Sequence, residues 1–87
     1  MGLTHADFFR YLPSAMGDHP YRVDGNTVYG EVFEGSVEIR IGEPKVRRIA
    51  LMAIPYSKVS FLFRGVSAEQ QQQFKTHFDL RYQRGGG

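Results

Sequence analysis

Hydrophobic residues recur at every second position between Tyr21 and Arg64, and this alternation constrains the fold more than any other feature of the chain. Alternating apolar and polar side chains are typical of β-strands with one buried and one solvent-facing side. The clearest run is Ser36–Ile41, where valine and isoleucine alternate with serine, glutamate and arginine. The dipeptides Asp24-Gly25 and Glu34-Gly35 favour tight turns between such strands. We therefore predict an antiparallel sheet in the middle of the chain.

The two ends of the chain have helical spacing instead. Thr4 followed by Asp7 resembles a capping box, which predicts a helix that begins at Thr4 and ends or kinks near Pro13. A Ser-x-x-Gln capping box at Ser67 predicts a second helix near the C-terminus. The aromatic residues of this second segment lie four positions apart, on one helical face: Phe74, Phe78 and Tyr82.

This order of elements predicts an α+β fold. We expect an N-terminal helix, a four- to five-stranded antiparallel meander sheet and a C-terminal helix, with the helices packed on one face of the sheet. Val46–Ile54 is apolar at both even and odd positions after Arg48, which predicts a central strand covered on both faces. The chain has 87 residues, enough for one core. We expect residues 1–87 to form a single domain with a flexible C-terminal tail at about 84–87.

Composition excludes several classes of protein. The chain has no cysteine, so disulfides, thiolate metal sites and cysteine nucleophiles are excluded. The first residues lack the basic and apolar regions of a secretory signal. The longest apolar stretch, Ile49–Pro55, is far shorter than the ~20 residues that span a bilayer. We therefore expect a cytoplasmic protein that makes no use of a membrane.

Motifs for catalysis, cofactors and metals are missing from the sequence. His5, His19 and His77 have no histidine four positions away, so no metal site is predicted. The chain also lacks a pair of carboxylates on one helix face, a nucleophile elbow and a glycine-rich phosphate loop. We assign no catalytic, cofactor-binding or metal-binding residue, expect no cofactor, and favour a non-enzymatic role. A small-ligand-binding protein or an enzyme without a recognisable motif stays the third hypothesis.

Charge is divided unevenly between the two halves of the chain. Residues 1–43 carry a net charge of −4 and residues 44–87 a net charge of +6. A basic surface attracts anions such as nucleic acid, although lysine and arginine on a sheet edge also prevent unwanted strand pairing. The candidate anion or nucleic-acid contacts are Arg47, Arg48, Arg81 and Arg84.

Two further segments suggest binding partners. Lys58–Gly65 interleaves basic and aromatic residues as sheet-face RNA binders do, but Phe61 and Phe63 share their parity with Val59, so we expect them to face the core. The end of the chain, Gly85–Gly87, resembles the free diglycine end of ubiquitin-like sulfur carriers over three residues. The interpretation we favour is a helix stop at Gly85.

Apolar side chains left over by this arrangement indicate an interface. The candidate interface residues are Tyr29, Phe33, Met52 and Ile54. Exposed apolar area marks binding surfaces, and a two-fold homodimer that packs two sheets together would complete the core. We therefore expect a protein–protein interaction or assembly module, with a protein partner or self-association, and anion or nucleic-acid binding as the alternative.

Overall fold

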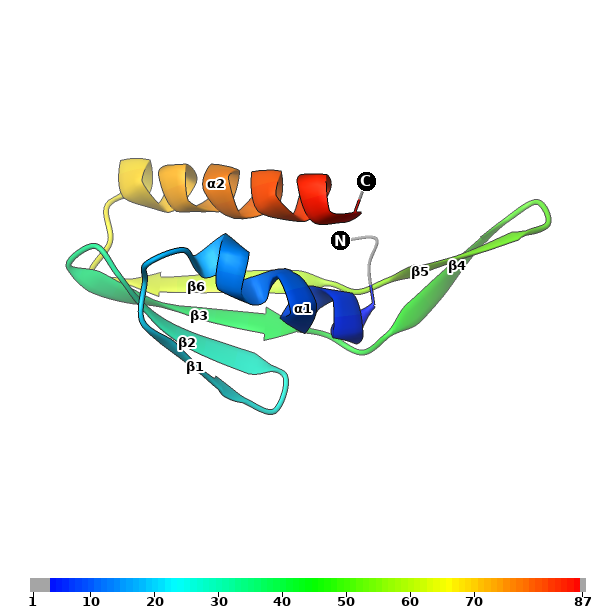
Figure 1. The fold of residues 1–87 in the computed structure, drawn as a ribbon, viewed down its shortest axis with the longest axis horizontal. Helices are drawn as coiled ribbons and strands as arrows, with labels where there is room; N and C mark the ends of the chain where they lie inside the picture. Colours follow the sequence, from blue (N-terminus) through cyan, green and yellow to red (C-terminus); the bar gives the residue numbers. More distant parts are fainter. Residues whose placement is uncertain (1–3, 87) are drawn as a thin grey trace.

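The structure is a computed structural model that describes residues 4–86, the last four of them by their backbone alone. Its elements follow the order α1 (His5–Met16), β1 (Tyr21–Asp24), β2 (Thr27–Val32), β3 (Gly35–Ile41), β4 (Lys45–Ile49), β5 (Met52–Tyr56), β6 (Val59–Arg64) and α2 (Ala68–Gly86) (Figure 1). An N-terminal helix, antiparallel strands and a C-terminal helix make this a small α+β protein, as the sequence predicts.

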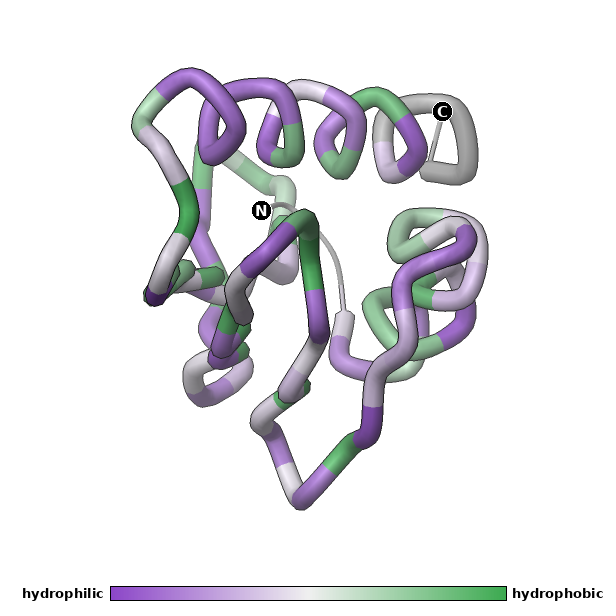
Figure 2. Tube along the Cα trace, turned by 90° about the vertical axis from the view of Figure 1, so that its left-hand side faces the viewer, coloured by the Kyte–Doolittle hydropathy of each residue, from purple (hydrophilic) through white to green (hydrophobic). Residues whose placement is uncertain are grey.

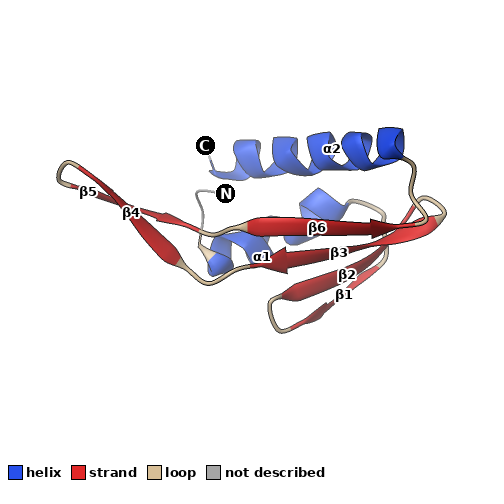
Figure 3. Cartoon of the chain, turned by 180° about the vertical axis from the view of Figure 1, so that it is seen from behind, coloured by secondary structure: helices blue, strands red, loops and turns tan. Residues whose placement is uncertain are grey.

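The strands form two separate sheets within the described residues. Strands β1, β2, β3 and β6 form one antiparallel sheet in that spatial order, and β4 pairs with β5 alone. The prediction of one central strand over Val46–Ile54 is therefore wrong. This segment is a hairpin that extends beyond the end of the four-stranded sheet (Figure 3).

The hairpin turn explains why the prediction fails. Ala50 adopts a φ of 54°, in the left-handed region, and reverses the chain between β4 and β5. A segment that is apolar at both parities is normally a strand covered on two faces. The pattern reports the type of each side chain and not what covers it, so a protruding apolar hairpin produces the same signature.

The core lies between the four-stranded sheet and side chains of both helices. Strand register places Val28, Ile39 and Phe61 side by side in one row across the sheet. Hydrophobic residues also recur from turn to turn along α2 (Figure 2). The buried core cluster comprises Phe8, Leu12, Ala15 and Met16 of α1, Val28, Val32, Val37, Ile39 and Ile41 of β2 and β3, and Phe74, Phe78 and Tyr82 of α2.

Aromatic rings connect β6 to α2. Phe61 and Phe63 are half-buried against the core, and the ring of Phe61 meets that of Phe78 edge-on at 5.3 Å. Phe63 meets Phe74 edge-on at 5.7 Å. Edge-to-face pairs of this kind add about 0.5–1.5 kcal/mol beyond the area they bury. The expectation that Phe61 and Phe63 face the core is confirmed.

Aromatic residues also join the two helices, although they are far apart in sequence. The ring of Phe8 stacks on that of Tyr82 at 5.5 Å. The Tyr82 hydroxyl donates a hydrogen bond of 2.6 Å to the backbone carbonyl of Phe8. Burial, with a smaller contribution from Tyr21, raises the pKa of the Tyr82 hydroxyl well above its ordinary value, because the charged phenolate is poorly solvated there.

Both predicted N-caps are present, and the one at Ser67 forms a complete capping box. The Thr4 side chain accepts a hydrogen bond from the Asp7 amide at 3.1 Å, and Ser67 and Gln70 exchange two bonds at the start of α2. Helix α1 does not end at Pro13 but continues through it to Met16, one residue before Gly17, whose φ is 61°. The backbone of α2 continues through Gly86, so the expected stop at Gly85 is not observed. Gly87 and the side chains of residues 83–86 lie outside the described part, and the flexible tail at 84–87 stays a prediction.

Replacement of a core ring should cost much more stability than replacement of an exposed residue on the same helix. We expect Phe78→Ala to lower the free energy of unfolding by about 3–5 kcal/mol, because it opens a cavity among packed rings. The control is Leu80→Ala, since Leu80 is 46% exposed, and it should change stability by less than about 0.5 kcal/mol. Urea unfolding measures both values. Equal losses would contradict the assignment of the core.

The raised pKa of Tyr82 predicts a loss of stability at alkaline pH. The unfolded chain releases the Tyr82 proton near pH 10, whereas the folded protein keeps it, so the free energy of unfolding should fall as the pH rises past about 10. Tyr82→Phe should make this fall shallower, while Tyr56→Phe, at the half-buried Tyr56 of β5, should leave it closer to that of the original chain. Urea unfolding between about pH 9 and about pH 11 tests the difference.

Candidate functional site

The most unusual surface of the molecule is the β4–β5 hairpin, Lys45–Tyr56, which we call the hairpin. Nine of its twelve residues are apolar or aromatic and three are cationic, with no carboxylate among them. None of these twelve side chains is buried. Leu51 at the turn is fully exposed, and Met52 is 64% exposed. Such a concentration of exposed apolar side chains is typical of a surface that another molecule covers.

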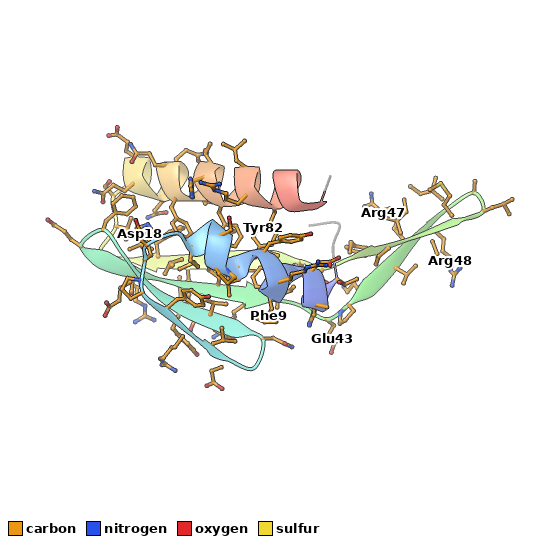
Figure 4. The ribbon with its side chains drawn as sticks, in the orientation of Figure 1. Phe9, Asp18, Glu43, Arg47, Arg48 and Tyr82 are labelled. Carbon is orange, nitrogen blue, oxygen red and sulfur yellow. The ribbon has the colours of Figure 1, made fainter. Side chains whose placement is uncertain are left out.

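Register divides the side chains of the hairpin between two faces. Arg47 lies opposite Ile54 and Ile49 lies opposite Met52, so these four share one face. The Arg47 guanidinium lies 5.8 Å from the centre of the Tyr56 ring, on the same face. Arg48 lies on the other face, and Figure 4 shows Arg47 and Arg48 on opposite sides of the hairpin. Each face therefore combines apolar side chains with a positive charge.

The edges of the hairpin differ from each other. Strand β5 contains Pro55, which has no amide hydrogen and therefore interrupts any ladder on its outer edge. Strand β4 has no proline, but three of its five residues are cationic, namely Lys45, Arg47 and Arg48. Charged residues of one sign discourage pairing with a second copy of the same edge.

The base of the hairpin is held by the body of the protein. The Gly42 amide donates to the Lys58 carbonyl at 2.7 Å, which closes the base between β3 and β6. His5, the first residue of α1, is half-buried and lies with its Nε2 2.6 Å from the Gly42 carbonyl oxygen. Because a carbonyl can only accept, the His5 nitrogen donates this bond. The start of α1 thus helps to position the hairpin.

The residues singled out by the sequence do not form one site. Arg47, Arg48, Met52 and Ile54 all lie on the hairpin. Arg81 is exposed on α2, and the side chain of Arg84 lies outside the described residues. Their proposed roles in binding stay predictions.

The other two candidate interface residues lie on the four-stranded sheet and its turn. Tyr29 is half-buried in β2, under the Arg22 guanidinium at 4.4 Å. Phe33 is exposed in the β2–β3 turn, with a φ of 55°, and its ring lies 5.8 Å from that of His19. The structure therefore separates both residues from Met52 and Ile54.

The side of the four-stranded sheet that faces away from the core is polar and balanced in charge. Its central row runs across the strands as Arg22, Tyr29, Glu38 and Leu62. Arg40 and Glu38 form an ion pair, with Nε and Oε2 3.3 Å apart. Shallow open hollows are lined by these residues and by Ser36 and Arg64. By register the face carries three arginines and three carboxylates, so it has little net attraction for an ion.

A second apolar surface lies along β1, at one of the two edges of the four-stranded sheet. Register places Tyr21 beside Gly30 and Val23 beside Val28, so both lie on the side of the sheet that carries the core. Both are nevertheless exposed, Val23 by 47%. The acidic residues in and next to β1 and β2 are Asp18, Asp24, Glu31 and Glu34. By register, Asp24 and Glu31 lie on the opposite side of the sheet from Tyr21 and Val23, so the apolar and acidic side chains approach this edge from its two faces. We call Tyr21, Val23 and the four acidic residues the β1 edge surface.

The sequence singled out four residues of the hairpin, Arg47, Arg48, Met52 and Ile54, but did not reveal that they share one protruding element, and it did not indicate the β1 edge surface. A signal for the hairpin was present, since Val46–Ile54 is nine residues long and strands usually have about 5–6. An apolar segment of that length is more often two short strands joined by a turn. For β1 no such signal existed, because whether the helices cover Tyr21 and Val23 depends on packing.

Comparisons with known proteins give no analogue for these surfaces. No protein-family model, no curated protein and no solved structure matches the chain. Among residues 4–86, no group of three or more histidine, aspartate or glutamate residues could hold a metal ion. No helix in the same part of the chain has the length and apolar character needed to cross a membrane.

Loss of the His5 contact should loosen the base of the hairpin. One hydrogen bond contributes about 0.5–1.5 kcal/mol, so His5→Ala should speed exchange of the Gly42 amide hydrogen about two- to tenfold. His77→Ala is the control, because His77 is exposed on α2. Hydrogen exchange followed by NMR measures both. An unchanged rate in His5→Ala would show that the bond does not hold the base.

Proposed function

We propose that this chain is a non-enzymatic assembly module that binds another protein through the hairpin. The observation that carries the proposal is that the hairpin exposes apolar side chains on both faces while its strands pair only with each other among the described residues. An isolated two-stranded hairpin is marginally stable in water. A covering partner would remove the exposed apolar area and stabilise the hairpin at the same time.

The apolar side chains of the hairpin supply part of the free energy that binding a partner needs. Complete burial of a valine, leucine, isoleucine or methionine side chain contributes about 1.5–3 kcal/mol. The large exposed side chains of this kind on the hairpin are Val46, Ile49, Leu51 and Met52. Burial of these four side chains contributes at most about 6–12 kcal/mol, since three of them are only about half to two-thirds exposed, and association costs about 4–15 kcal/mol in lost freedom of motion. The proposal therefore includes further contacts beside the hairpin.

The proposed arrangement has both helices on one face of the four-stranded sheet. Support comes from the core, because α1 and α2 contribute to the same buried cluster as the inward side chains of β2 and β3. A Cβ atom on Gly30 of β2 would come within 2.7 Å of Met16 of α1, so the helix and the strand lie very close. With its core completed in this way, the protein has the hairpin and the β1 edge surface to offer to a partner.

Nucleic-acid binding by the hairpin is the second candidate, and one observation favours it. The segment from Pro44 to Ala68 contains no carboxylate, while its cations include Arg47 and Arg48. A two-stranded β-ribbon fits the major groove of DNA, and apolar side chains at its tip can wedge between bases. The ratio of nine apolar or aromatic residues to three cations favours a protein surface instead.

A crosslinking experiment tests the proposed function. A photoreactive amino acid in place of Leu51, at the tip of the hairpin, should form a covalent adduct with a protein in cells that naturally produce the chain. The same substitution at Gln72, which is exposed on the polar face of α2, is the control and should form far less. Mass spectrometry identifies the adduct.

Each outcome of that experiment decides between the candidates. A defined protein captured at position 51 and not at position 72 supports the assembly module. An adduct with nucleic acid would support the second candidate and contradict the first. No adduct at position 51 would contradict both.

A further inference from the structure

We infer that the partner of the hairpin is a second copy of this chain, and that the hairpin of each copy binds the β1 edge surface of the other. This inference rests on the proposed function, because it names the protein that the hairpin binds. The two surfaces lie at different places on the molecule, the hairpin at one end and the β1 edge surface along one edge of the four-stranded sheet. Each is apolar, and their charges are opposite.

The charges of the two surfaces are complementary. Residues 18–34, which include the β1 edge surface, contain four carboxylates and one arginine, a net charge of −3. Residues 44–58, which include the hairpin, contain two lysines, two arginines and no carboxylate, a net charge of +4. Complementary charge accelerates association and excludes wrong partners. A second copy is therefore attracted by its acidic edge to the basic hairpin.

Backbone hydrogen bonding points to the same pairing. Strand β1 forms one of the two edges of its sheet, β6 being the other, and can accept one more strand. Of the two hairpin strands, β4 has an unbroken series of amides, whereas β5 is interrupted by Pro55. The structure thus assigns β4 as the strand that extends the sheet next to β1 of the other copy.

The same charges oppose the simplest competing arrangement. Two β4 strands from two copies would bring Lys45, Arg47 and Arg48 close to their own equivalents, and like charges at this distance repel. Pairing of β4 with the acidic β1 edge instead places opposite charges next to each other. The cations on β4 thereby disfavour pairing of hairpin with hairpin and favour pairing of hairpin with edge.

Reciprocity provides the additional contact that one hairpin lacks. In a two-fold dimer each copy gives one hairpin and receives one, so every contact occurs twice. A standard stable interface buries about 800 Å² per partner, which is roughly an eighth of the 6037 Å² that this chain exposes. In the proposed dimer each copy buries both its hairpin and its β1 edge surface, and together these two surfaces can provide an interface of that size.

The decisive experiment reverses the charge of each surface separately. The hairpin variant is Arg47→Glu with Arg48→Glu, and the edge variant is Asp24→Lys with Glu31→Lys. All four side chains are exposed, so the fold should be retained. Sedimentation equilibrium of the purified chain at micromolar concentration should show a dimer, and each variant alone should raise its dissociation constant about a hundredfold, because attraction becomes repulsion.

Mixing the two variants should restore the dimer. The basic hairpin of the edge variant then meets the acidic edge of the hairpin variant, and the acidic hairpin meets the basic edge. A heterodimer formed on mixing also proves that both variants are folded. The control is Lys75→Glu with Arg81→Glu on α2, which changes the net charge as much as the hairpin variant does and should leave the dimer intact.

Three results would overturn the inference: a monomeric original chain, variants that dimerise as tightly as the original, or a mixture that stays monomeric. These results can be distinguished from failure of the proposed function. A chain that is monomeric in solution but crosslinks from position 51 to a different protein would contradict the second copy and leave the assembly module in place. A nucleic-acid adduct at that position would contradict both.

Discussion

The fold depends on the contact between Phe8 and Tyr82, which joins the first helix to the last. The rings stack, and the Tyr82 hydroxyl donates to the Phe8 carbonyl across 74 positions of sequence. A chain of 87 residues has a small interior, so rings that bury about 150–250 Å² each are an efficient way to fill it. The hydrogen bond adds direction to this packing, because it fixes where α2 lies along α1.

Several apolar side chains remain exposed outside the core to which both helices contribute, and most of them lie on two surfaces. Val46, Ile49, Leu51 and Met52 lie on the hairpin, and Tyr21 and Val23 lie along the sheet edge. The proposed assembly gives both groups a common explanation, since the apolar surface that one copy cannot bury is buried by another. The charges around the two groups then determine which surface meets which.

The sequence predicted those parts of the fold that local patterns determine. Alternation identified β2, β3 and β6, and capping boxes located the starts of both helices, because hydrogen bonds at a helix end involve neighbours in sequence. Whether other parts of the protein bury a segment is a different matter, because it depends on residues that are far away in the chain. For that reason Val46–Ile54 was mistaken for a central strand. For the same reason Tyr29 was grouped with Met52, although the first lies on the sheet and the second on the hairpin.

The position of the hairpin in the chain separates the residues proposed to bind a partner from the residues that stabilise the core. Ile41 and Val59 are direct partners in the ladder between β3 and β6, so the chain leaves the sheet after one and returns to it at the other. The intervening residues are an insertion at a single point of the body. If the hairpin binds a partner as proposed, mutations between Lys45 and Tyr56 would alter which molecule is recognised and would preserve the interior, because none of these side chains is buried.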